Sequence, residues 1–74
     1  MIGKLIVFPE YEDFVKNGKI YEFCGGGLPY YFGISHEKIV IEGLEGIIYR
    51  DFITYENYTF ALNICEKLIR GKEV

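Results

Sequence analysis

Apolar residues in the last third of the chain recur at the spacing of an α-helix. Between residues 54 and 71 they fall three or four positions apart and share one helical face. This face consists of Tyr58, Ala61, Leu62, Cys65, Leu68 and Ile69. Phe60 and Ile64 form a second apolar pair, four residues apart, that lies off this stripe. We therefore predict an amphipathic helix with more apolar surface than a single core requires.

Residues suited to capping occur at both ends of this predicted helix. Thr54 is a good N-cap, and Glu56 lies in the first turn, where the helix dipole favours an acidic side chain. Lys67 and Arg70 lie near the other end, and Gly71 offers the left-handed residue that terminates many helices.

Four segments in the middle of the chain read as β-strands separated by turn residues. The predicted strands are residues 19–24, 30–35, 38–42 and 47–52. The predicted breaks are residues 25–29, 36–37 and 43–46. In the first of these strands Tyr21 and Phe23 share a face, and in the second Tyr30, Phe32 and Ile34 do so.

The first part of the chain predicts one more strand and one short helix. Residues 5–8 are a short β-rich run that ends at Pro9, and we expect a buried strand there. Tyr11, Phe14 and Val15 lie three and four residues apart, which predicts a helix of one to two turns over residues 10–16.

The predicted order of elements is therefore β-α-β-β-β-β-α, in a single domain that spans residues 1–74. Strands joined by short turns favour an antiparallel meander, and the long helix is expected to cover one face of it. The fold class is α+β, with a small sheet of four to five strands covered by the C-terminal helix. The pattern leaves open whether the first strand pairs at an edge or in the middle.

The net charge of −3 is mild. It argues against a nucleic-acid-binding surface, which needs clustered Lys and Arg. Glu10, Glu12 and Asp13 are grouped near the start of the short helix, where the helix dipole favours acidic side chains. The apolar run at residues 5–8 is far shorter than the roughly 20 residues that cross a bilayer, so we expect no membrane span and a cytoplasmic location.

Cys24, followed by three glycines, is the local arrangement that most resembles a chemical site. A thiol beside amide-rich Gly25, Gly26 and Gly27 can act as a nucleophile with an oxyanion pocket, and His36 is the base that the chain offers. No residue supplies an orienting third group, and a strand that ends in a glycine turn explains the same pattern. A thiol-dependent or small-ligand site is therefore the alternative hypothesis, and we expect no metal and no cofactor.

Cys65 faces the predicted core, so we expect it and Cys24 to be separate free thiols.

The absence of a complete catalytic motif favours a non-enzymatic module that docks on another protein or on itself. Candidate contact residues are Phe60 and Ile64 on the helix, with Tyr30 and Tyr31 on the sheet. A homodimer and a larger protein partner both fit this pattern. Small size, mild acidity and this composition are typical of regulators or inhibitors from a phage, virus or other mobile element, although many cellular proteins share them.

Overall fold

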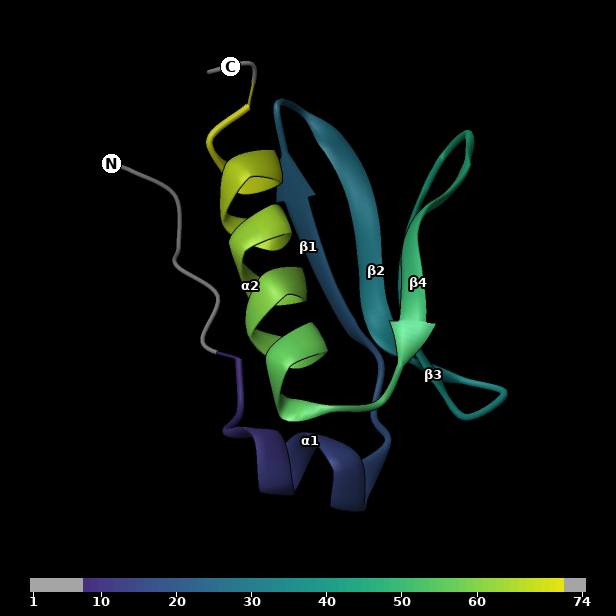
Figure 1. The fold of residues 1–74 in the computed structure, drawn as a ribbon. Coiled ribbons are helices and arrows are strands. Elements are labelled where there is room, and N and C mark those ends of the chain that lie inside the picture. The colour runs from purple at the N-terminus through teal and green to yellow at the C-terminus, as the bar shows by residue number, and fades with distance from the viewer. Residues whose placement is uncertain (1–7, 72–74) are drawn as a thin grey trace.

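Short turns connect the four strands of the sheet in chain order. In a computed structural model that describes residues 8–71, the strand order is β1-β2-β3-β4 and every neighbouring pair is antiparallel (Figure 1). The elements are α1 (Tyr11–Asn17), β1 (Tyr21–Gly25), β2 (Leu28–Ser35), β3 (Lys38–Gly43), β4 (Gly46–Phe52) and α2 (Tyr55–Ile69). The predicted α+β class, the antiparallel sheet and the covering helix are confirmed.

The break predicted at residues 25–29 is wrong in its extent. Only Gly26 and Gly27 form the turn, with φ values of +59° and +84°, while Gly25 and Pro29 already belong to β1 and β2. Left-handed φ values at both central residues are those of a type I′ hairpin turn, which glycine adopts without steric cost. Gly26 and Gly27 therefore form a tight hairpin turn, and the glycine segment is not an open loop.

The turn predicted at residues 36–37 is confirmed, whereas the turn predicted at residues 43–46 is shorter, because Gly43 and Gly46 belong to β3 and β4. His36 and Glu37 connect β2 to β3 with φ values of +54° and +63°. Residues other than glycine, asparagine and aspartate seldom adopt this left-handed backbone conformation. Residues 44–45 connect β3 to β4.

Close to this turn the register of the last pair shifts. Ile41 pairs with Tyr49 and Glu42 with Ile47, so Ile48 is the extra residue of a β-bulge.

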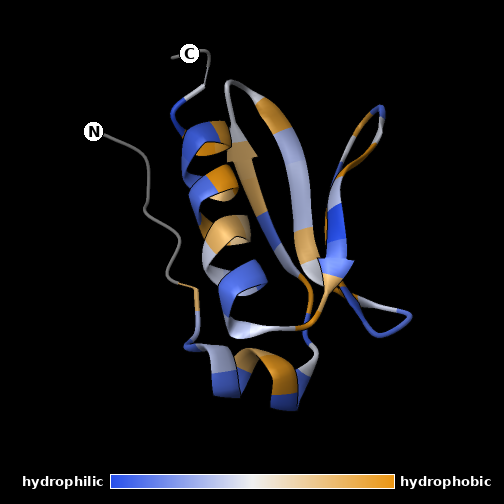
Figure 2. Cartoon of the chain, in the orientation of Figure 1, coloured by the Kyte–Doolittle hydropathy of each residue, from blue (hydrophilic) through white to orange (hydrophobic). Residues whose placement is uncertain are grey.

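Helix α2 lies against one face of the sheet with its apolar side inward (Figures 1 and 2). Its stripe contributes Tyr58, Ala61 and Cys65 to the core, each almost completely buried. The sheet contributes Phe23, Phe32, Ile39 and Ile41, and α1 contributes Phe14. The face of the sheet away from α2, which carries Glu22 and Tyr31, is called the outer face below.

The caps of α2 are those that its sequence predicts. The Thr54 hydroxyl oxygen accepts a hydrogen bond from the Asn57 amide at 3.1 Å. At the other end, Gly71 has a φ of +82° and donates from its amide to the carbonyl of Leu68 at 3.0 Å.

Helix α1 closes one end of the core. It begins and ends one residue later than predicted, and Gly18, in the left-handed conformation, donates from its amide to the Phe14 carbonyl. The Phe14 ring stacks on Phe32 with centroids 4.8 Å apart. The strand predicted over residues 5–8 lies outside the described residues except for Phe8, whose ring packs edge-on against Phe32 at 5.3 Å.

Candidate functional site

Cys24 and His36 lie at opposite ends of the sheet. Cys24 pairs with Pro29 on β2, and Ser35, the residue before His36, is six residues further along that strand. At about 3.3 Å per residue the thiol and the imidazole are about 20 Å apart. The Nδ1 atom of His36 instead lies 3.1 Å from the hydroxyl oxygen of Ser35. His36 is therefore too distant to act as a base for Cys24.

The two cysteines are separate free thiols, as expected. Cys24 is exposed, whereas Cys65 is fully buried beneath α2. Burial raises the pKa of the Cys65 thiol from its ordinary value of 9.0 to about 12, so this thiol stays protonated at neutral pH. Cys65 is thus a core residue and a poor nucleophile.

The four candidate contact residues do not share one surface. Tyr31 is exposed on the outer face of the sheet, opposite Glu42 of β3. Tyr30 points to the helix side and stacks on Phe23 with centroids 5.5 Å apart. Phe60 is 55% exposed on α2, whereas Ile64 is half-buried against the core. Tyr30 and Phe60 therefore remain together on the helix side.

Tyr30 and Phe60 belong to a continuous row of apolar side chains beside α2, which we call the apolar strip. Its members are Leu28, Tyr30, Leu44, Ile48, Tyr49 and Phe60. Four of them are largely exposed: Leu28 at 47%, Leu44 at 70%, Ile48 at 44% and Phe60 at 55%.

Contacts between neighbouring side chains make this strip continuous. The Phe60 and Tyr49 rings lie 5.4 Å apart, and Ile48, the extra residue of the bulge, directly precedes Tyr49 in β4. Ile48 and Tyr30 meet above Gly43, where a Cβ atom would lie 3.2 Å and 3.0 Å from them. Beside Gly43 lies a hollow of about 480 Å³ that Leu28 and Leu44 also line.

The strip carries little charge. Glu45 is the charged residue that lines the hollow within the described part of the chain. Burial, together with the nearby Asp51 carboxylate, raises the pKa of Tyr49 above its ordinary value of 10.0, so its hydroxyl is neutral at physiological pH. The strip can therefore bury apolar area without leaving ionised groups inside an interface.

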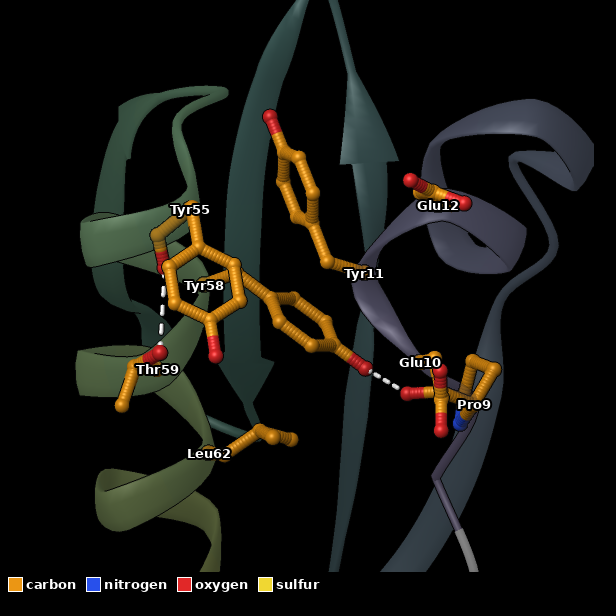
Figure 3. A pocket seen from close by; sticks show the side chains of 8 residues that line it. All are labelled: Pro9, Glu10, Tyr11, Glu12, Tyr55, Tyr58, Thr59 and Leu62. Atoms are coloured by element: carbon orange, nitrogen blue, oxygen red, sulfur yellow. Dashed lines mark hydrogen bonds between the residues drawn. The ribbon is translucent and has the colours of Figure 1, made fainter.

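A second hollow, the tyrosine cleft, lies between the first turns of α1 and α2 (Figure 3). It has a volume of about 590 Å³ and is lined by Pro9, Glu10, Tyr11, Glu12, Tyr55, Tyr58, Thr59 and Leu62. The Tyr58 hydroxyl donates a hydrogen bond to the Pro9 carbonyl, which connects the two walls.

Sequence reasoning missed the tyrosine cleft. It placed Tyr58 on the core stripe of the long helix and used Tyr11 only as part of the spacing that predicts the short helix. Glu10 and Glu12 were interpreted as acidic residues at the start of that short helix. The grouping depends on the packing of α1 across the beginning of α2, and no local pattern in the chain indicates that crossing. The residue that could have indicated the cleft is Tyr55, an aromatic residue in the first turn of α2 that lies off the core stripe.

Within residues 8–71, no three His, Cys, Asp or Glu side chains are grouped closely enough to hold a metal ion. Neither described helix has the length and hydropathy that crossing a bilayer requires.

Comparisons with known proteins give no relative for this chain: no family model, no curated protein and no solved structure matches it.

Proposed function

We propose that this protein is a non-enzymatic protein-interaction module that docks through the apolar strip. The observation that carries this proposal is the exposure of four large aliphatic and aromatic side chains in one continuous row. Contiguous exposed apolar surface of this kind usually marks an interaction site in a small protein. Tyr30, Tyr49 and Phe60 add rigid aromatic area, which typically supplies much of the binding energy at interfaces.

The position of the strip favours a second copy of this chain as its occupant. β4 is an edge strand among the described residues, so the backbone N–H and C=O groups on its side away from β3 can pair with another strand. Ile48 and Tyr49 belong both to this edge and to the strip. A two-fold axis beside β4 would bring two strips together and pair two edges, which is the closed, self-complementary arrangement of most homodimers.

The test is the solution mass, measured by light scattering from micromolar to millimolar protein. We expect the wild-type protein to approach the mass of a dimer as concentration rises. Phe60→Asp places a charge in the strip without touching the core, because Phe60 is 55% exposed. It is expected to weaken the dimer at least about tenfold, which corresponds to about 1.4 kcal/mol.

Tyr31→Asp is the matched control, since Tyr31 is an aromatic residue of similar exposure on the outer face. It should leave the mass curve unchanged. Ile64→Asp is unsuitable as a test because half-buried Ile64 packs on the core and the substitution would also destabilise the fold. A wild-type protein that stays monomeric at every concentration would remove the second copy as the occupant.

A further inference from the structure

We propose that Phe60 of each copy in the dimer enters the hollow beside Gly43 of the other copy. This inference rests on the proposed function and deepens it, because it names the side chain that binds and the site that receives it. The hollow is then a binding site for an aromatic ring, and a second copy of this chain supplies that ring.

The two ends of the apolar strip differ in shape. At one end Phe60 is 55% exposed on α2 and contacts Tyr49, with ring centroids 5.4 Å apart. At the other end lies the hollow of about 480 Å³ beside Gly43, and Phe60 does not line it. Each strip therefore carries an exposed ring at one end and an open hollow at the other.

The symmetry of the dimer can match both ends at once. Both strips lie on the helix side of the sheet, so two copies that join through β4 must keep their α2 helices on the same face of the joined sheet. A two-fold axis perpendicular to the sheet does this, and it makes the two β4 strands antiparallel. The Phe60 end of each strip then lies against the hollow end of the other.

The spacing along β4 agrees with this arrangement. Ile47 lines the hollow, and Tyr49 contacts Phe60. These two residues of β4 are two positions apart, which is about 7 Å along the strand. An antiparallel pairing centred on Ile48 exchanges the two positions, and so it places Phe60 of each copy over the hollow of the other.

The lining of the hollow suits an aromatic ring. Leu28, Leu44 and Ile48 supply aliphatic side chains that are largely exposed in the single copy, and Tyr30 supplies a ring. An aromatic side chain buries about 150–250 Å² and gains further from contact with a second ring. Glu45 is exposed, so its carboxylate can stay in water at the rim. The volume lies in the range of pockets that hold small organic molecules, so it admits a phenyl ring.

Isotope-filtered nuclear Overhauser spectra test this contact in the wild-type protein. Protein with ¹³C-labelled leucine methyl groups is mixed with an equal amount of unlabelled protein, at a concentration at which the dimer predominates. We expect contacts between the Phe60 ring protons of the unlabelled copy and the Leu28 and Leu44 methyl groups of the labelled copy. Phe60 does not line the hollow of its own copy, so these contacts report on the second copy alone.

A double-mutant cycle on the dimer affinity gives the matching energetic test. We expect Phe60→Ala to raise the Kd about tenfold and Leu44→Ala about threefold. Because either substitution breaks the same contact, the double variant should raise the Kd about tenfold and not by the roughly thirtyfold product of independent changes. Tyr31→Ala on the outer face is the matched control, and adding it to Phe60→Ala should leave the Kd of Phe60→Ala unchanged.

The outcomes separate this inference from the proposed function. A dimer in which Phe60 contacts Phe60 of the other copy, or in which the effects of Phe60→Ala and Leu44→Ala multiply, would overturn the inference and leave the strip as the docking surface. A protein that stays monomeric at every concentration would overturn both.

Discussion

Gly25 lies where the last turn of α2 crosses the end of β1. A Cβ atom built on this residue would lie 1.8 Å from the carbonyl oxygen of Leu68, a contact that no side chain can make. Because the obstacle is backbone, neither side can yield without moving the helix or the strand. The absence of a side chain at Gly25 therefore sets the closest approach of α2 to the sheet.

We predict that Gly25→Ala lowers the free energy of unfolding by about 3 kcal/mol, since it overpacks a rigid contact. Urea denaturation followed by circular dichroism measures the change. Gly18→Ala is the matched control: a Cβ at Gly18 meets nothing within 4 Å, and its φ of +60° costs only about 1 kcal/mol. Equal losses for the two variants would contradict the role of close approach at Gly25.

Cys65 and Tyr58 make the stability of the core sensitive to high pH. Burial raises the pKa of Cys65 from 9.0 to about 12 and is the main cause of the rise in Tyr58 from 10.0 to about 12. Between these values the unfolded chain has lost the proton and the folded chain keeps it, so stability falls as pH rises. Below about pH 9 both states hold the proton and the effect disappears.

We expect the free energy of unfolding to fall above pH 9 by up to about 1.4 kcal/mol per pH unit for Cys65, with Tyr58 adding a loss above pH 10. Urea titrations at successive pH values measure this slope. Cys65→Ala should lower stability at neutral pH through the cavity it leaves, yet flatten the alkaline slope. Cys24→Ala, which removes an exposed thiol, should keep the parental slope. A slope unaffected by Cys65→Ala would contradict the assignment.

Residue types alone explain some of these roles and not others. The free thiol at Cys65 and its burial follow from its place on the helical stripe. The role of Gly25 does not, because its obstacle lies 43 residues further along the chain, at Leu68. From the sequence, Gly25 and its two neighbours form a flexible loop; in the fold, one residue is a contact point and only the other two form a turn.

At the scale of elements, α2 is specified by its sequence more completely than any other part. Its stripe, its N-cap and its terminal glycine all act as predicted. Capping matters here because the first turn of α2 also forms one wall of the tyrosine cleft.

We predict that Thr54→Ala costs about 1 kcal/mol of stability, since it leaves the Asn57 amide without its hydrogen-bond acceptor. Thermal or urea unfolding checks this. Thr59→Ala, the matched substitution within the helix, should be neutral or slightly stabilising, because the Thr59 hydroxyl bonds only to the Tyr55 carbonyl of its own helix. Equal losses of stability for Thr54→Ala and Thr59→Ala would contradict a specific contribution of the N-cap hydrogen bond.

The sheet was predicted in order but not in detail. Alternation of apolar and polar residues locates every strand end within two residues. The largest differences are that β1 begins two residues later, at Tyr21, and that β2 begins two residues earlier, at Leu28, because the glycine turn is tight. The bulge at Ile48 follows from the register between β3 and β4, which no single strand encodes. This bulge turns Ile48 toward Tyr30. The alternation of apolar and polar residues along the strands therefore does not predict the apolar strip.

At the scale of the whole molecule, the two faces of the sheet differ in kind. One face is covered by α2 except along the strip. The outer face mixes charged residues such as Glu22 and Glu42 with the exposed apolar residues Tyr31, Ile47 and Phe52. From the sequence, Phe60, Ile64, Tyr30 and Tyr31 were equal candidates. The fold divides them, because neighbouring residues of a strand point to opposite sides and Tyr30 and Tyr31 are neighbours.

The most direct test of the strip as the docking surface is a dilution series followed by ¹⁵N amide spectra. We predict concentration-dependent shifts at Leu44, Ile48 and Phe60, with Glu22 and Tyr31 of the outer face unchanged. Shifts confined to the outer face, or no shift at any concentration, would contradict the assignment of the strip as the surface through which two copies bind.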